Sequence, residues 1–146
     1  MQTTTPIPRP ALVLGWLGVL PFAALALATA AGRLPHEPAA TGLLAYGVVI
    51  LSFMGGAQWG LSMLAPEEAM GRGLTISVLP ALIGFACWFL PMRAAFIGLT
   101  LTYAGLLAYD ISSARAGIAP VWYPALRRQL TGAVILCLLL GAVFGG

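Results

Sequence analysis

The sequence predicts an all-α integral membrane protein, a bundle of five transmembrane helices joined by short loops. Hydrophobic residues make up 60% of the chain and charged residues only 8%. A soluble domain carries about 25% charged residues, because its surface has to face water. The mean hydropathy of +0.97 agrees with the composition. Apolar runs separated by prolines, glycines and arginines then predict the individual helices.

The expected organisation is a cytoplasmic tail over residues 1–10 and a single transmembrane domain over residues 11–146. Its spans are expected at about residues 11–31, 41–64, 74–90, 94–110 and 129–145. About 20 apolar residues in a helix cross the roughly 30 Å hydrocarbon core. Residues 65–73 are expected to form a loop or a short interfacial helix, and residues 111–126 a longer connection.

Arginine supplies all the basic residues, and its distribution predicts the orientation. With five spans, one side of the membrane receives Arg9, Arg72, Arg115, Arg127 and Arg128. The other side receives only Arg33 and Arg93. The positive-inside rule therefore predicts a cytoplasmic N-terminus.

The same arginines indicate which partners to expect. Arg115, Arg127 and Arg128 are expected to contact lipid head groups at the membrane edge. They lie at the ends of apolar runs and form no basic stripe with interleaved aromatic residues. The sequence therefore predicts membrane lipids as partners and no nucleic acid.

The second span contains an unusual group of small and polar residues. Ser52, Gly56 and Gly60 recur every four residues and are expected to form a helix-packing face. Gly55, Gln58 and Trp59 lie on a neighbouring stripe. Gln58 needs a hydrogen-bonding partner near the membrane, so it either ties two helices together or contributes to a pocket or partner contact.

Tyr103 and Asp110 in the fourth span are candidates for the same pocket or contact. An ionisable side chain within a membrane is a functional-site hypothesis by default. Asp110 lies near the end of its span, however, so an ion pair with Arg72, Arg115 or Arg127 is the preferred interpretation. Proton transfer would need a second buried acid or a histidine, which the spans lack.

Cofactor, metal and catalytic sites are not expected. The single histidine cannot supply a pair of haem ligands. Cys87 and Cys137 lie in separate apolar runs without further ligands nearby. Glu67 and Glu68 are adjacent, but they face apart on a helix. The chain is therefore expected not to be an enzyme.

Three segments carry a resemblance to a known family. They are Tyr46 to Gly60 (YGVVILSFMGGAQWG), Tyr103 to Asp110, and Trp122-Tyr123 followed by Leu126-Arg127 and the last span. In these segments the chain resembles the family of the mitochondrial transmembrane protein 69 and its bacterial relatives, a domain of unknown function. The resemblance implies a multi-pass protein of the inner (cytoplasmic) membrane. It implies no activity, substrate or cofactor.

Two functional hypotheses follow. The first is a non-catalytic accessory subunit or assembly factor of a larger energy-transducing membrane complex, respiratory or photosynthetic. Glycine-rich helix faces and little mass outside the membrane favour it. The alternative is a small homo-oligomeric transporter, channel, or lipid- or quinone-handling protein with a cavity near Gln58. The polar and aromatic stripe of the second span favours that one.

Overall fold

The computed structural model describes residues 6–32 and 36–145, which are helical apart from short connections. The helices are α1 (Arg9–Ala31), α2 (His36–Ser62), α3 (Glu67–Cys87), α4 (Met92–Arg115) and α5 (Tyr123–Phe144). All five are long and apolar enough to cross a membrane, so the predicted fold class is confirmed. Residues 1–5 of the expected tail and Arg33 lie outside the described residues, as does the side chain of the single histidine.

Several helices are longer than the apolar runs indicated. α3 begins at Glu67 and continues without a break to Cys87, so residues 67–73 are its first two turns and the alternative of a loop is wrong. Two glutamates in its first turn are stabilised by the positive end of the helix dipole. α4 continues to Arg115, and α5 begins at Tyr123. The fifth helix therefore has 22 residues, and only residues 116–122 connect it to α4.

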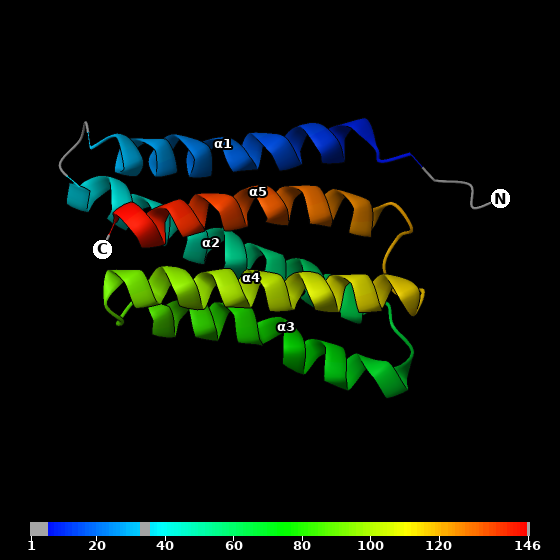
Figure 1. Cartoon of the computed structure of the whole chain (residues 1–146). Helices are drawn as coiled ribbons and strands as arrows, with labels where there is room; N and C mark the ends of the chain where they lie inside the picture. Colours follow the sequence, from blue (N-terminus) through cyan, green and yellow to red (C-terminus); the bar gives the residue numbers. More distant parts are fainter. Residues whose placement is uncertain (1–5, 33–35, 146) are drawn as a thin grey trace.

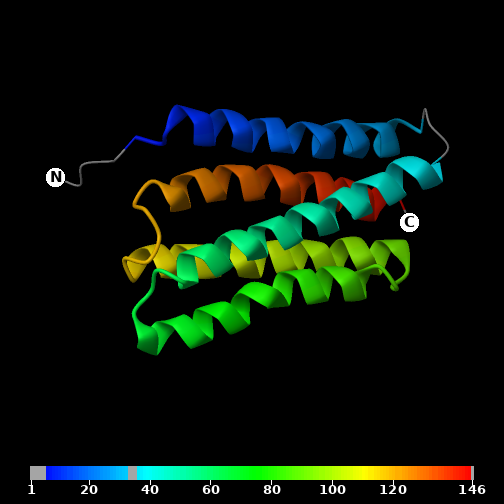
Figure 2. The same ribbon diagram turned by 180° about the vertical axis from the view of Figure 1, so that it is seen from behind.

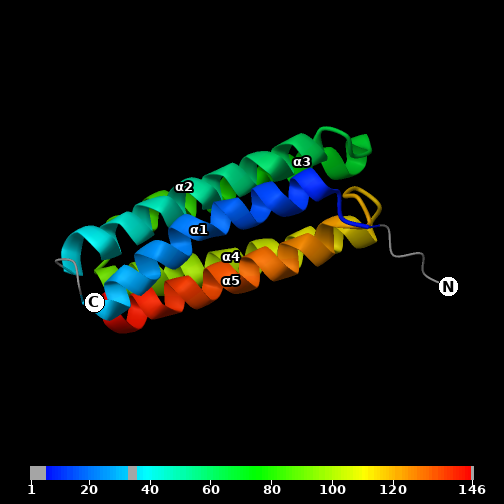
Figure 3. The same ribbon diagram turned by 90° about the horizontal axis from the view of Figure 1, so that it is seen from above.

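The arrangement places successive helices antiparallel, as Figure 1 shows. The N-terminus of α1 and the α2–α3 and α4–α5 connections lie at one end of the bundle, which Figure 2 shows from behind. Among the described residues, α2 is the helix that contacts all four others. Viewed from above, α1 lies along α2 and α5 (Figure 3). The span that contains Gln58 and the Gly55-Gly56 pair thus forms the centre of the bundle.

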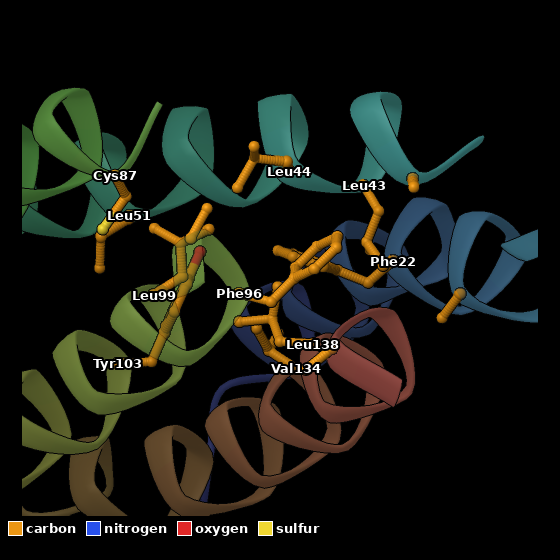
Figure 4. Close-up of a cluster of buried hydrophobic side chains, with 14 of the residues drawn as sticks. Phe22, Leu43, Leu44, Leu51, Cys87, Phe96, Leu99, Tyr103, Val134 and Leu138 are labelled. Carbon is orange, nitrogen blue, oxygen red and sulfur yellow. The ribbon is translucent and has the colours of Figure 1, made fainter. Parts of the chain in front are cut away.

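The core consists of large apolar side chains contributed by α1, α2, α4 and α5. Phe22, Leu43, Phe96, Leu99 and Leu138 are fully buried, and Figure 4 shows them converging between the helices. Many other large apolar side chains remain exposed on the outside of the bundle. Such exposure suits a surface that faces lipid, because the lipid tails are themselves apolar.

Glycines let α2 and α3 approach each other closely. A Cβ atom built on Gly55 would lie 2.5 Å from the carbonyl oxygen of Ser77 in α3. The next residue, Gly56, would meet nothing within 4 Å. Pro80 lies one turn after Ser77 and removes one backbone N–H from α3, which changes direction partway along its length (Figure 2). The α2–α3 contact therefore depends on the glycine facing inwards.

We expect Gly55→Ala to destabilise the protein and Gly56→Ala to leave its stability unchanged or slightly raised. The added methyl group at residue 55 collides with backbone that cannot move cheaply, and overpacking of this kind costs about 1–3 kcal/mol. Both variants gain the same helix propensity, so their difference reports the packing term alone. Thermal unfolding in detergent, followed by circular dichroism, measures it. Equal unfolding midpoints for the two variants would contradict the packing described for α2 and α3.

Candidate functional site

Three polar side chains meet inside the bundle, each from a different helix. Gln58 comes from α2, Asp110 from α4 and Arg127 from α5, and we call them the polar cluster. Gln58 and Asp110 are each 1% exposed, and Arg127 is 5% exposed. Charged groups are rarely buried so completely unless they are paired. The cluster is therefore the most unusual chemical feature of the bundle interior.

Both carboxylate oxygens of Asp110 accept a hydrogen bond within the cluster. Arg127 donates from Nε to Oδ2 at 2.5 Å, and Gln58 donates from Nε2 to Oδ1. Arg127 Nη1 also lies 2.8 Å from the sulfur of Met54. With its two oxygens engaged in this way, the carboxylate links α4 to both α2 and α5. Its geometry is that of a structural tie between helices.

The local sequence places the cluster near one end of the bundle. Gln58 is four residues before the last residue of α2, and Arg127 is four residues after the first residue of α5. At 1.5 Å per residue, these side chains lie about 6 Å inside their helix ends. Ser62 donates its hydroxyl to the carbonyl oxygen of Gln58 at 2.8 Å. The cluster thus sits about one helical turn from the end of the bundle.

The five residues expected to form one pocket or contact have separate roles. Gln58 and Asp110 meet in the polar cluster. Tyr103 reaches from α4 towards α2 (Figure 4) and donates its hydroxyl to the carbonyl oxygen of Gly47 at 2.8 Å. Gly55 packs against α3. Trp59 is 44% exposed on the outer surface. The structure therefore does not bring these five residues together.

The three arginines expected to contact lipid head groups lie in different environments. Of the three possible partners for Asp110, the structure selects Arg127. Its assignment as a head-group contact is therefore corrected: its guanidinium is held inside the bundle by the carboxylate. Arg115 and Arg128 are exposed at the same end of the bundle, where head-group contact stays a prediction.

Within the described part of the chain, the stripe of Ser52, Gly56 and Gly60 does not pack against another helix. Gly56 and Gly60 are exposed, and a Cβ atom on either would meet nothing within 4 Å. Ser52 is partly buried and donates its hydroxyl to its own helix, at the carbonyl oxygen of Val48. We call this stripe the outer α2 face. The packing expected for it is available only to another molecule.

A cleft of about 110 Å³ lies between α1, α2 and α5. Residues that line it include Leu14 and Gly18 from α1, Phe53 and Met54 from α2, and Arg127 and Thr131 from α5. We call it the α1–α2–α5 cleft. Leu14 and Phe53 are more than half exposed, so the cleft opens on the outside of the bundle. Gln58 does not line it, although Met54, one turn earlier in α2, and Arg127 of the polar cluster do.

A comparison with known proteins identifies the family. The family described as "Protein of unknown function (DUF3429)" matches residues 7–143, a range that contains both the polar cluster and the cleft. The chain belongs to this family. It is also 34% identical over 137 residues to Transmembrane protein 69 of Xenopus tropicalis. The expected resemblance is therefore confirmed.

The similarity to known proteins covers only part of the relative and includes no solved structure. The aligned region covers 90% of this chain but 53% of the Xenopus tropicalis protein, so the chain spans about half the length of that relative. No solved structure matches the chain. The family assignment therefore relates this chain to another transmembrane protein, and the family has no assigned activity.

Sequence reasoning missed Met54 and Thr131 and misassigned Arg127. Arg127 and Arg128 are adjacent, and only the helical register of α5 decides which of them points inwards. Pro124 in the first turn of α5 was the available signal, because proline favours that position and would have moved the helix start upstream of both arginines. No group of three or more His, Cys, Asp and Glu side chains that could hold a metal ion occurs among the residues described.

We expect Arg127→Met and Asp110→Leu each to destabilise the protein strongly, and the double variant to recover part of the loss. Each single change leaves an uncompensated charge inside the bundle, which costs about 3–5 kcal/mol, whereas removal of both charges leaves none. A double-mutant cycle of thermal unfolding in detergent measures the coupling. Arg128→Met is the matched control and should have little effect, because Arg128 is exposed. Additive losses for the two changes would contradict the pairing.

Proposed function

We propose that this DUF3429 protein is a non-catalytic accessory subunit or assembly factor of an energy-transducing inner-membrane complex, respiratory or photosynthetic. The observation that carries the proposal is the outer α2 face. Within lipid, helices associate through close packing, and small residues four apart provide the space for it. Gly56 and Gly60 keep that space open on the outside of the bundle. The proposed partner is therefore a helix of another membrane protein.

The interior of the bundle supports a structural role. Both carboxylate oxygens of Asp110 are engaged, one by Gln58 and the other by Nε of Arg127. Tyr46 and Tyr103, the other polar side chains that cross between helices, donate their hydroxyls to the backbone carbonyl oxygens of Gly18 and Gly47. These bonds join helices and leave the same atoms unavailable for chemistry on a substrate. An accessory protein needs this kind of stable scaffold.

The proposed orientation places the end with the exposed arginines in the cytoplasm. That end carries Arg9, Arg72, Arg115 and Arg128, all exposed. The positive-inside rule supports this orientation without the buried Arg127. In the proposed setting, the chain presents the outer α2 face to its partner and the arginines to the lipid head groups.

A lipid- or quinone-handling protein is the second candidate. The α1–α2–α5 cleft favours it, because the cleft opens on the lipid-facing side of the bundle and is lined by a buried arginine and a buried threonine. A transporter or channel from the same group of hypotheses would need a continuous polar path, which this cleft alone does not provide.

We expect Gly56→Leu and Gly60→Leu each to release the protein from its partner complex. A leucine side chain fills the space into which the partner helix would pack. Gly132→Leu is the matched control, because Gly132 in α5 is also exposed and a Cβ atom there meets nothing within 4 Å. The measurement is native gel migration with mass spectrometry of tagged protein, extracted from its own membranes in mild detergent.

The wild-type protein and the Gly132→Leu control should migrate with larger respiratory or photosynthetic subunits, and the two α2 variants should migrate alone. Full association of both α2 variants would remove the outer α2 face as the contact. Migration of the wild-type protein by itself, or as a small homo-oligomer, would reject the accessory role and favour the second candidate.

A further inference from the structure

We propose that the α1–α2–α5 cleft binds an uncharged, membrane-soluble molecule that presents a carbonyl oxygen to Arg127 and Thr131. The proposal rests on two polar atoms without partners. Arg127 Nη2 and Thr131 Oγ1 are the buried side-chain nitrogen and oxygen that lack a hydrogen bond among the residues described. Both residues line the same cleft. Leaving such groups unpaired in an apolar surrounding costs about 1–3 kcal/mol each.

Thr131 differs from most of the other hydroxyl residues of the helices. Six of them donate to the carbonyl oxygen four residues earlier in their own helix, which satisfies the hydroxyl without any outside partner: Thr29, Ser52, Ser62, Thr75, Thr100 and Thr102. Thr131 is 1% exposed and makes no such bond to Arg127. Its hydroxyl therefore lacks the partner within its own helix that satisfies the other six, and an acceptor that enters the cleft would supply one.

Arg127 and Thr131 together specify the chemistry of the ligand. They are four residues apart on α5 and therefore lie on one face of the helix. A guanidinium N–H and a hydroxyl both donate, and a carbonyl oxygen accepts two hydrogen bonds. The charge of Arg127 is already balanced by Asp110 at 2.5 Å. An anionic ligand would leave a net negative charge in apolar surroundings, so an uncharged acceptor fits better.

The shape of the cleft specifies how the ligand would lie. A closed cavity of about 150 Å³ holds a benzene molecule, so 110 Å³ admits the end of a molecule rather than all of it. The exposed side chains of Leu14 and Phe53 flank the opening, where an apolar tail can continue into the lipid. A prenyl quinone and the ester group of a glycerolipid share this chemistry, a carbonyl oxygen joined to an apolar tail.

Gly18 supplies a way to close the cleft. It lines the cleft, and a Cβ atom added to it meets nothing within 4 Å. Gly18→Leu therefore fills space that is otherwise available to a ligand. Thr131→Val removes the unpaired hydroxyl while keeping nearly the same shape. Neither substitution alters the outer α2 face, so this test and the association test succeed or fail separately.

The experiment measures the thermal unfolding midpoint of delipidated protein in detergent, with four added probes. A short-tailed prenyl quinone and a diacylglycerol carry carbonyl oxygens. A dialkyl ether analogue of the diacylglycerol and an isoprenoid hydrocarbon do not. We expect the midpoint to rise with a carbonyl probe and not with its carbonyl-free counterpart. A rise with the quinone alone assigns a quinone site, and a rise with the diacylglycerol alone assigns a glycerolipid site.

Thr131→Val should have opposite effects on the stability of the free protein and on its affinity for the probe. Without a probe, Thr131→Val should unfold at the same or a higher temperature than the wild type, because it removes an unpaired buried hydroxyl. With a probe, its dissociation constant should rise about threefold to tenfold. Gly18→Leu should lose the probe-induced rise, and Gly132→Leu should keep it.

Three results would overturn the proposal. They are no rise with either carbonyl probe, equal rises with the carbonyl-free counterparts, and an unchanged rise in Thr131→Val. The test with Thr131→Val remains informative even if Gly18→Leu fails to fold.

Discussion

The ion pair between Asp110 and Arg127 is the interaction on which the arrangement of the bundle depends. An unpaired charge buried within a membrane-spanning helix is costly, about 2.5–3.5 kcal/mol at the helix centre and less near the ends, where Asp110 and Arg127 lie. The two charges therefore have to meet, and they can do so in one relative register of α4 and α5. Gln58 adds the same requirement for α2, because its amide donates to the second carboxylate oxygen. One carboxylate thus sets the positions of three helices.

Glycines complement this polar constraint by deciding how close the helices come. Gly55 admits the Ser77 carbonyl oxygen of α3, and Gly47 and Gly141 admit large side chains of the core. Gly56 and Gly60, which are four residues apart, face away from the bundle. In lipid there is no water to drive helices together, so the benefit of a small residue comes from the partner that packs on it. The same residue type therefore serves the fold on one face of α2 and, in the proposed complex, association on the other.

Arg127 connects the structural centre with the cleft. Its Nε pairs with Asp110, and its Nη2 has no partner among the residues described. A ligand that engages Nη2 would contact a side chain whose other bonds fix α4 and α2. The family match and the likeness to Transmembrane protein 69 set these features in a multi-pass membrane protein of unknown function. The outer α2 face and the cleft are separate surfaces, and their proposed partners are of different kinds.

The sequence by itself predicted a bundle of five membrane-crossing helices, because its low charge content requires a lipid environment and its apolar runs are about the length of a spanning helix, which satisfies its own backbone in lipid. It also singled out Gln58 and Asp110, since polar groups in apolar runs need partners. Only the tertiary structure decided that Arg127 rather than Arg128 pairs with Asp110, and that Gly55 faces inwards while Gly56 faces outwards. The lipid-facing and protein-facing sides of such helices are both apolar. Periodicity therefore places residues on a common face, but only the neighbouring helices decide which face is buried.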